Sequence, residues 1–391
     1  MSRSITIGLL WHSVNSGNLG VGALTVANIR IIRDACAAGG RTPKFVILGF
    51  TDPGRAAYVQ ADDIEFVPIN TKAMLPFGAF DRAVRRCDLM IDIGGGDSWT
   101  DIYGPKRFAF LWYSKWRAMM LGRPLILAPQ TIGPFSKSIE SWLAARVMTR
   151  AAAVVARDPA SFGAARSMAP TARVSEAVDV AFALPSEPWP KVPGKVAVGV
   201  NVSGLLFNRG YDGKSSFGME IDYADYVRKL LARLTARGDV AVKLISHVHS
   251  DAMPIDDDVR VARRLAEEFP SVELIPPFAD PVEAKSCIAA LDFLVAARMH
   301  ACIAAFSSGV AVMPVAYSRK FSGLFEGVLG YSHGVPVRGV ATDMAVDMTM
   351  TALDKREELA AQTKAGRDKA ATRLADYSSL LVNALGGAAA R

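Results

Sequence analysis

The chain has 391 residues, enough for about two to three domains of ordinary size. Hydrophobic residues make up 51% of it and charged residues 21%, which excludes a disordered or low-complexity protein. The net charge of +7 favours anionic ligands. Because the sequence has no dense Lys/Arg block, no zinc-finger spacing and no aromatic-basic interleaving, we expect no nucleic-acid partner.

The cysteines and the apolar runs indicate a reducing compartment and no membrane span. The four cysteines are scattered and share no CxxC spacing, so neither a disulfide framework nor a structural zinc site is predicted. The apolar run Ile5–Trp11 is shorter than a signal-peptide core, and charged residues interrupt the most apolar stretch, Leu291–Phe306. We therefore expect a cytoplasmic protein, whose oligomeric state the sequence leaves open.

Short β-branched runs alternate with segments of helical period, which predicts parallel sheets with crossover helices. In the first half the predicted strands are Ile5–Trp11, Lys44–Phe50, Ile64–Ile69, Asp88–Ile93, Pro124–Ala128 and Ala153–Ala156. The segment Leu184–Pro193 holds four prolines in ten residues and continues neither a helix nor a central strand. We place the boundary between two domains there.

The same alternation restarts after the boundary. Helical patterns over Tyr223–Ala236 and Val259–Phe269 separate strands predicted at Val196–Val202, Val240–Ser246, Val272–Ile275, Phe293–Ala296 and Val310–Ala316. After Val340 the pattern is helical to the end. The sequence thus predicts an N-terminal α/β domain over residues 1–185, a C-terminal α/β domain over residues 195–340 and a helical segment over residues 341–391.

Two glycine-rich turns follow predicted strands in the first half. Residues 16–22, SGNLGVG, precede a helix, and their backbone N–H groups suit an anion or a sugar. The spacing of the three glycines is not the GxGxxG pattern of dinucleotide-binding sites. The alternative to a ligand site is a plain tight turn between strand and helix. Residues 92–101 read DIGGGDSWTD, and the three glycines leave the ligand-facing surface of this turn without side chains. Asp97 or Asp101 would then accept a proton or bind sugar hydroxyls. Helix capping by Asp97 and solvation of Asp101 are the alternatives.

Cations and histidines follow other predicted strands. Arg157 suits a carboxylate or a phosphate, and an ion pair with Asp158 or Asp179 is the alternative. In the second half, three groups project from one sheet edge: His247 with His249, Arg298 with His300, and the run Tyr317 to Lys320. The spacing of these histidines and the nearby arginine are poor for metal binding, so we predict no metal site. A buried core histidine is the alternative for His300.

The motifs also have a recognisable order over roughly the first 330 residues. They read GNLG…GALT, DIGGGDSWTDIYG, PQTIGPF, VVARDPAS, VNVSG, ISH and ARMHACIAAFSSGVAVMPVAYSRK. In this order they resemble the polysaccharide pyruvyl transferase family. The resemblance implies two Rossmann-like parallel-sheet domains in a GT-B-like arrangement with a C-terminal helical tail. It also implies transfer of pyruvate from phosphoenolpyruvate, as a cyclic ketal, to a sugar of a surface polysaccharide, such as an exopolysaccharide, or of its lipid-linked precursor.

The resemblance assigns expected roles to individual residues. Arg298 and His300 match the family's Arg-x-His at the phosphoenolpyruvate site, and Arg157 matches its Arg-Asp. Further positions on the same motifs, expected to bind substrate, are Asn18, Gly94, Gly95, Gln130, His247 and Lys320. The resemblance thus places the acceptor on the first domain and phosphoenolpyruvate on the second.

The chemistry of the donor agrees with these assignments. Phosphoenolpyruvate carries a phosphate and a carboxylate, which two or more cations such as Arg157, Arg298 and Lys320 would hold. His300 would donate a proton or hold the phosphate, and Asp97 or Asp101 would take a hydroxyl proton. The reaction requires no metal and no organic cofactor.

One position departs from the family pattern, because many members carry an aspartate where this chain has Val21. A non-catalytic family member, acting as a binding subunit in glycan assembly, is therefore one alternative function. A nucleotide-sugar glycosyltransferase is another, although the expected acidic ribose-binding residue in the helix after Gly309 is not evident. If the acceptor is lipid-linked, the net charge of +7 assists peripheral contact with an anionic membrane.

Overall fold

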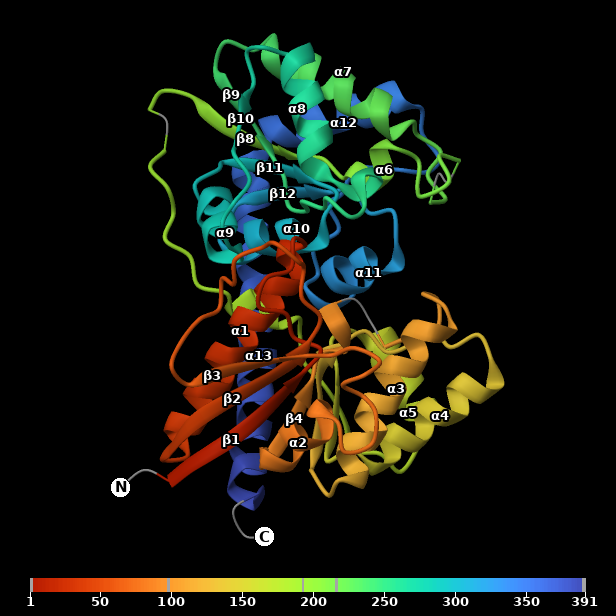
Figure 1. Ribbon diagram of the computed structural model, residues 1–391. Coiled ribbons are helices and arrows are strands. Elements are labelled where there is room, and N and C mark those ends of the chain that lie inside the picture. The colour runs from red at the N-terminus through yellow and green to blue at the C-terminus, as the bar shows by residue number, and fades with distance from the viewer. Residues whose placement is uncertain (1–2, 97–98, 192, 215–216, 389–391) are drawn as a thin grey trace. The chain divides into compact units, whose positions relative to one another are not determined.

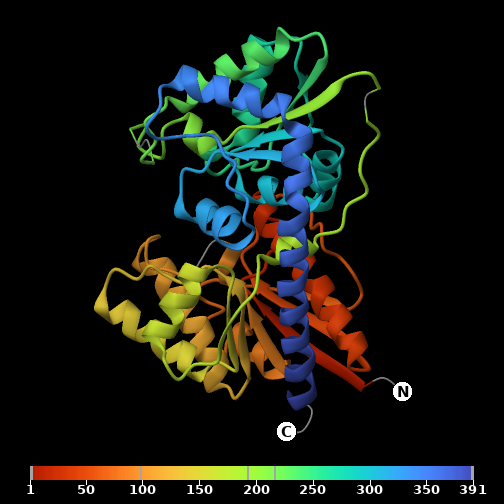
Figure 2. The same cartoon turned by 180° about the vertical axis from the view of Figure 1, so that it is seen from behind.

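The computed structural model describes residues 3–96, 99–191, 193–214 and 217–388. The chain divides into two compact units. The first unit comprises Met1–Ser16, Leu24–Ala183 and Ala370–Arg391, and the second comprises Gly17–Ala23 and Leu184–Lys369. Each unit contains its own parallel sheet, and Figures 1 and 2 show the chain from opposite sides.

Seven of the described strands form the sheet of the first unit. They are β1 (Arg3–Leu10), β2 (Arg41–Gly49), β3 (Ile64–Pro68), β4 (Leu89–Asp92), β5 (Leu125–Gln130), β6 (Ala153–Ala156) and β7 (Val174–Glu176). Their order, β3-β2-β1-β4-β5-β6-β7, reverses direction between β1 and β4. Every residue of β4, β5 and β6 is buried, which explains their continuous apolar sequences. In such sheets, ligands bind beyond the carboxyl ends of the strands at the point of reversal.

Helices cover the sheet of the first unit. One buried apolar cluster joins it to α2 (Ala79–Arg86), α3 (Pro105–Met120), α4 (Ser138–Arg150) and α5 (Pro159–Met168). In α5 the side chain of Asp158 caps the helix by accepting a hydrogen bond from the Ser161 N–H. The long helices α1 (Leu19–Ala38) and α13 (Arg356–Ala388) are joined by a 3.1 Å hydrogen bond from the Tyr377 hydroxyl to Asn28 Oδ1, and they lie side by side in Figure 2.

The second unit repeats this plan with five described strands. They are β8 (Val196–Asn201), β9 (Val240–Ile245), β10 (Glu273–Leu274), β11 (Phe293–Ala296) and β12 (Ala311–Pro314), in the order β10-β9-β8-β11-β12. The direction reverses between β8 and β11. One apolar cluster joins the sheet to α7 (Tyr223–Thr235), α8 (Asp258–Glu268) and α12 (Thr342–Asp354), whereas α9 (Pro281–Ala289) and α10 (Met299–Ser307) lie on the other side in Figure 1.

Short helical segments complete the units. In the first unit they are η1 (Gly94–Gly96) and η2 (Val180–Ala183), and in the second they are α6 (Gly204–Phe207), η3 (Pro254–Asp256), α11 (Arg319–Ser322) and η4 (Gly323–Val328). Across the described ranges, none of the helices has both the length and the apolarity needed to cross a lipid bilayer. The two parallel sheets with crossover helices confirm the α/β class predicted from the sequence.

Candidate functional site

The reversal point of the second sheet brings together three strand ends. The Arg298 N–H, directly after β11, donates a 3.0 Å hydrogen bond to Oδ1 of Asn201 at the end of β8. The Asn201 side chain in turn donates to the Ile245 carbonyl at the end of β9, at 2.9 Å. Helix α10 begins at the next residue, Met299, so its N-terminal N–H groups and positive dipole end lie at this edge. An anionic ligand is favoured at such a place.

The glycine-rich segment Gly17–Ala23 belongs to this edge of the second unit. The Leu19 N–H donates to the His247 carbonyl at 3.1 Å, and the His249 N–H donates to the Gly17 carbonyl at 2.9 Å. The Asn18 side chain accepts from the Gly20 N–H at 3.0 Å and so caps the start of α1. The segment that the sequence assigned to the first domain is therefore hydrogen-bonded to the loop after β9.

His300 lies in the first turn of α10 and packs against Gly20. A Cβ atom built on Gly20 would fall 2.3 Å from Nδ1 of His300, a distance that no side chain tolerates. The structure thus brings together Asn18, His247 and His300, three of the residues predicted to bind or act on substrate. Only a glycine at position 20 lets the imidazole occupy its place.

His247 is buried beside this imidazole. Burial lowers the pKa of His247 to about 3, and the neighbouring His300 and Arg298 act in the same direction. His247 is therefore neutral near physiological pH, where it offers one hydrogen-bond donor and one acceptor but no charge. It suits recognition of a ligand rather than protonation of one.

Arg298 is held by two carboxylates. Its Nη2 atom lies 2.7 Å from Oδ1 of Asp256 and 2.6 Å from Oδ1 of Asp258, and its Nε atom donates to both oxygens of Asp258 at 3.2 Å. Burial acts to lower the pKa of Arg298, but the charges of Asp258 and Asp256 outweigh it and raise the pKa further. These contacts use Nε and Nη2, so Nη1 is the atom through which Arg298 would contact a ligand.

Arg298, Asp256 and Asp258 form an ion triad, and Asp258 connects this triad to the surrounding backbone. Its carboxylate accepts backbone N–H groups from Gly204 at 2.8 Å, His247 at 3.2 Å and Val248 at 3.0 Å. Arg298 therefore helps to fix the loop that carries His247. Lys320, the remaining predicted cation of this unit, lies in α11 after β12, the neighbour of β11 in the sheet.

In the first unit, a buried polar network lies under the triple-glycine turn. Nζ of Lys115 is 3.0 Å from Oδ1 of Asp92 at the end of β4, and both side chains are fully buried. The Gln130 amide donates to Oδ2 of Asp92 at 3.0 Å. A Cβ on Gly94 would fall 2.4 Å from Oε1 of Gln130, and Gly95 has a φ of 74°. Gly94 is required by the close approach of Gln130 and by its φ of 68°, and Gly95 is required by its positive φ.

Asp101 anchors a loop. Its Oδ2 atom accepts hydrogen bonds from the N–H and hydroxyl of Ser136 at 2.6 and 2.8 Å and from the Lys137 N–H at 3.2 Å. Burial acts to raise the pKa of Asp101, but these hydrogen bonds outweigh it, and the pKa lies below its usual value. Such a carboxylate is a weak base. Asp97, the other predicted base, lies outside the described residues.

Arg157 is also buried in an ion pair. Its Nη1 atom lies 2.8 Å from Oδ2 of Asp179, and its Nε atom donates to the Thr131 hydroxyl at 2.8 Å. The alternative pairing with Asp179 weighed from the sequence is therefore present, in the interior rather than on the surface. Arg157 belongs to the first unit and Arg298 to the second. Their shared role in donor binding stays a prediction.

Comparisons with known proteins identify the family. The sequence matches the polysaccharide pyruvyl transferase family over residues 31–319, more than half of the chain. The chain belongs to this family. Its Arg-x-His segment at 298–300 lies inside the matched range, at the reversal point of the second sheet. No curated protein sequence matches the chain significantly.

Solved structures show the fold of this pyruvyl transferase family member. UDP-GlcNAc 2-epimerase from Neisseria meningitidis aligns with a TM-score of 0.60 at 10% identity, covering 98% of this chain and 99% of that chain. Sucrose-phosphate synthase from Thermosynechococcus elongatus gives 0.57 at 11% identity, covering 98% and 100%. HepE from Anabaena in complex with UDP-glucose gives 0.54 at 12% identity, covering 98% and 100%. The predicted class, two Rossmann-like domains of the GT-B-like type, is confirmed.

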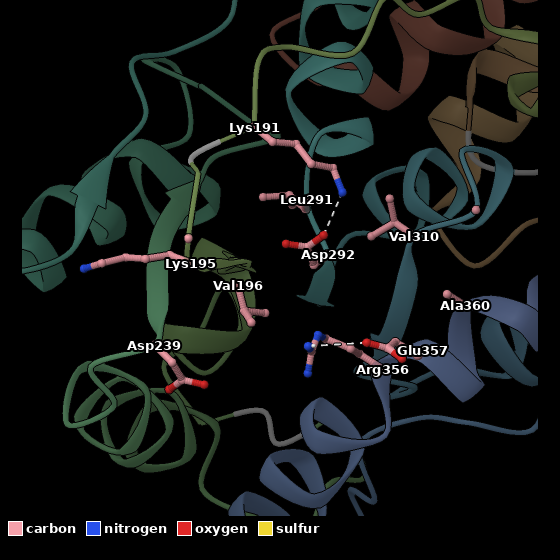
Figure 3. Close-up of a pocket in the computed structure, with 12 residues that line it drawn as sticks. Lys191, Lys195, Val196, Asp239, Leu291, Asp292, Val310, Arg356, Glu357 and Ala360 are labelled. Carbon is pink, nitrogen blue, oxygen red and sulfur yellow. Dashed lines mark hydrogen bonds and ion pairs between the residues drawn. The ribbon is translucent and has the colours of Figure 1, made fainter.

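A cavity of about 490 Å³ in the second unit is a poor candidate site (Figure 3). Its walls include Val196, Asp292 and Val310, which stand at the amino ends of strands, opposite to the edge where parallel sheets bind ligands. Its charges are largely paired within the protein, with Lys191 at 2.7 Å from Asp292 and Arg356 at 3.7 Å from Glu357. We do not assign a ligand to this cavity.

Sequence reasoning missed two features of the family member's sites. The buried Lys115–Asp92 pair was not predicted, although a lysine inside the apolar run FAFLWYSKW of α3 was a usable signal. The ion pairs of Asp256 and Asp258 with Arg298 were not predicted either. In sequence, an aspartate at the start of a surface helix looks the same as an aspartate that pairs with a buried arginine. Among the described residues, no group of three His, Cys, Asp or Glu side chains could hold a metal ion.

Proposed function

We propose that the protein transfers the pyruvyl group of phosphoenolpyruvate to a sugar of a surface polysaccharide or of its lipid-linked precursor, forming a cyclic ketal. The observation that carries the proposal is that the family's Arg-x-His segment lies at the reversal point of the second sheet, with His300 at the N-terminus of α10. This is where a parallel sheet binds an anionic ligand.

The reaction balances without an added oxidant or reductant. A proton adds to the methylene carbon of phosphoenolpyruvate, and two sugar hydroxyl oxygens form bonds to C2. The bond between C2 and the phosphate oxygen breaks, and inorganic phosphate leaves. Of the two hydroxyl protons, one replaces the proton given to the methylene group and the other leaves with the phosphate. The protein must therefore hold two anionic groups, deliver a proton to the methylene carbon and accept the protons of two hydroxyl groups.

The residues at the second sheet edge suit these tasks. The N-terminus of α10, Nη1 of Arg298 and the Lys320 ammonium would hold the phosphate and the carboxylate. His300 would protonate the methylene carbon or bind the leaving phosphate, and neutral His247 would orient the donor. The acceptor hydroxyls would come from a sugar bound by the first unit, as the family resemblance implies.

The test is phosphate release that depends on both phosphoenolpyruvate and an acceptor glycan, with the ketal methyl group followed by NMR. We expect phosphoenolpyruvate, and not nucleotide sugars, to raise the thermal midpoint of unfolding. Nucleotide sugars acting alone would favour the glycosyltransferase alternative. Binding of phosphoenolpyruvate without turnover on any acceptor would favour the non-catalytic alternative.

Two histidine variants refine this test. His300→Ala should lower turnover by about 100- to 10,000-fold, the usual contribution of a general acid. His333→Ala is the matched control, because His333 is hydrogen-bonded to Gln362 on the exposed side of α13. If His300→Ala is destabilised yet turns over normally per folded molecule, His300 is a core residue and its assignment falls.

A further inference from the structure

The positive charge of the chain is concentrated in one segment of the first unit. Residues 105–150 contain eight Lys or Arg and one acidic residue, a difference of +7 that equals the net charge of the whole chain. The acidic residue, Glu140, is 7% exposed and lies 3.5 Å from the Lys137 ammonium. The segment runs from α3 through β5 to α4, and α3 and α4 pack side by side (Figure 1).

One stripe of α4 combines exposed apolar and cationic side chains. Ile139, Trp142, Arg146 and Arg150 follow one another at spacings of three, four and four residues, which places them on one face of the helix. Ile139 and Trp142 expose 64% and 55% of their surface, and both arginines are exposed as well. The Arg146 guanidinium lies 5.1 Å from the centroid of the Trp142 ring.

A second stripe, on α3, continues this surface. Trp112, Trp116 and Met120 lie four residues apart, and the rings of the two tryptophans are stacked with 6.2 Å between their centroids. Met120 exposes 59% of its surface. The Arg150 guanidinium lies 4.6 Å from the centroid of the Trp116 ring and so joins the two helices. The two stripes together form the α3–α4 face.

The arginines of the α3–α4 face have no carboxylate partner. Two other cations of the segment, Lys115 and Arg117, pair with aspartates from neighbouring elements. Within the described parts of the chain, neither Arg146 nor Arg150 forms an ion pair, and each stacks on a tryptophan instead. A contiguous apolar patch rimmed by polar groups is typical of a surface that binds a partner, because its burial removes apolar area from water.

We propose that the α3–α4 face binds the surface of an anionic lipid bilayer. Ile139 and Trp142 would enter the headgroup region, where tryptophan is favoured, and Arg146 and Arg150 would contact lipid phosphates. The charge complementarity between this face and an anionic bilayer carries the choice of partner. The proposal goes beyond the proposed function, because it assigns a docking surface rather than a substrate or a reacting group.

Other partners fit the α3–α4 face less well. A second copy of the chain would bring the same positive charge against it, and like charges repel. A nucleic acid would pair with the arginines, but its phosphates would leave the aliphatic side chains of Ile139 and Met120 without an apolar contact. A bilayer supplies anionic phosphates and apolar acyl chains next to each other.

Co-sedimentation of the full chain with vesicles tests the proposal. The vesicles are made of phosphatidylcholine alone or of an equal mixture of phosphatidylcholine and phosphatidylglycerol. Neither phosphoenolpyruvate nor an acceptor is present, so the result does not depend on the proposed function. We expect binding to the mixed vesicles to be at least ten times tighter, and to weaken as added salt screens the charges.

Variants locate the surface. Arg146→Gln combined with Arg150→Gln should weaken binding to the mixed vesicles by about twentyfold, since each cation near an anionic surface contributes about fivefold. Brominated lipids measure whether Trp142 enters the bilayer, because bromine quenches the fluorescence of nearby tryptophans. Quenching should be smaller in Trp142→Phe than in the wild type.

A second pair of arginines gives the matched control. Arg263 and Arg264 are exposed on α8 of the second unit, and Arg264 lies 5.6 Å from the centroid of the Phe207 ring. Arg263→Gln combined with Arg264→Gln removes the same charge as the test pair but leaves the α3–α4 face unchanged. This double variant should change vesicle binding less than twofold. The thermal midpoint of each variant shows that it is folded.

Four results would overturn the proposal. These are no binding to mixed vesicles, equal binding to both kinds of vesicle, wild-type binding in the Arg146 and Arg150 double variant, and an equal loss in the two double variants. Binding to poly-glutamate in place of vesicles, dependent on Arg146 and Arg150, would assign the face to an acidic protein. Vesicle binding through this face without pyruvyl transfer would keep the surface and reject only the proposed function.

Discussion

Gly20 determines where the His300 imidazole lies, and this leads to a test at a single position. Gly20 lies in the first turn of α1, where alanine normally favours the helix by up to about 1 kcal/mol. In this chain the added methyl group would fall 2.3 Å from Nδ1 of His300 and displace the ring. We expect Gly20→Ala to lower turnover per folded molecule by about ten- to a hundredfold, because small misplacements of a reacting group are costly.

The control for this variant is Gly163→Ala. Gly163 also lies in a helix, α5, but a Cβ atom there meets nothing within 4 Å. This substitution should leave turnover unchanged and stabilise the protein slightly. Wild-type turnover in Gly20→Ala, measured with phosphate release and corrected for the folded fraction, would show that the position of His300 does not matter to the reaction.

The ion triad of Arg298 predicts a large loss of stability. Removing the guanidinium leaves Asp258 buried without its cation, and breaking a buried pair in this way costs about 3–5 kcal/mol. Urea unfolding of Arg298→Ala measures this cost, and its phosphoenolpyruvate affinity, measured on the folded protein, should fall by about ten- to a hundredfold.

An exposed arginine gives the comparison for Arg298. Arg237 also bonds two carboxylates, those of Asp239 and Asp354, but on the surface, so Arg237→Ala should cost less than about 1 kcal/mol. A cost for Arg298→Ala as small as this would contradict the buried triad. Unchanged affinity for phosphoenolpyruvate would leave Arg298 as a positioning residue only.

The sequence predicted which residues lie at the ends of strands but not which side chains those residues contact. His247, Arg298 and His300 could be predicted at one edge because each follows an apolar run, and parallel strands end together. Their pairing could not be predicted, since the contacts of Arg298 with Asp256 and Asp258 join segments that are distant along the chain. The same holds for the Gly20–His300 contact.

At the scale of elements, the apolar runs predicted most strands to within a few residues. Ala153–Ala156 and Phe293–Ala296 were predicted with the bounds of β6 and β11. The edge strand β7 was missed, because Val174–Glu176 is three residues long, half-buried and without a repeated apolar pattern. The bonding of residues 17–23 to the loop after β9 was also missed, since it depends on backbone hydrogen bonds that no side-chain pattern encodes.

A chain of hydrogen bonds joins α13 to α1 and β1. The Tyr377 hydroxyl donates to Oδ1 of Asn28, the Asn28 amide donates to Nε2 of His12 at 3.0 Å, and Nδ1 of His12 donates to the Leu10 carbonyl at 3.1 Å. All three side chains are buried. Every hydrogen-bonding group in this chain has a partner only while His12 is neutral. The neutral imidazole then carries its proton on Nδ1 and accepts at Nε2.

Tyr377→Phe tests how much this network stabilises the docking of α13. The change leaves Oδ1 of Asn28 buried without its donor, so we expect the free energy of unfolding to fall by about 1–3 kcal/mol. Tyr113→Phe in α3 is the control, because the Tyr113 hydroxyl makes no hydrogen bond with the described residues. Equal urea midpoints for Tyr377→Phe and the wild type would show that the helix is held by its apolar contacts alone.

At the scale of the whole molecule, both units contain a histidine that is buried in its neutral form. Burial lowers the pKa of His12 in the first unit to about 4 and that of His247 in the second to about 3. In the unfolded chain a histidine titrates near pH 6.5. Below that pH the unfolded chain binds protons that the folded protein does not, so acid favours unfolding.

The expected pH dependence follows from these two groups. The free energy of unfolding should be nearly constant above about pH 7.5, should begin to fall as the unfolded histidines titrate near pH 6.5, and should fall by up to about 3 kcal/mol per pH unit between about pH 6 and 4. Carboxylates whose pKa is lowered by hydrogen bonds, such as Asp81 and Asp222, lose their stabilisation only at lower pH. His12→Gln should reduce the slope by about half, whereas His333→Gln, at a half-buried position whose imidazole bonds the exposed Gln362, should not change it. An equal slope in His12→Gln and the wild type, measured by urea unfolding across this range, would show that His12 is protonated in the folded protein.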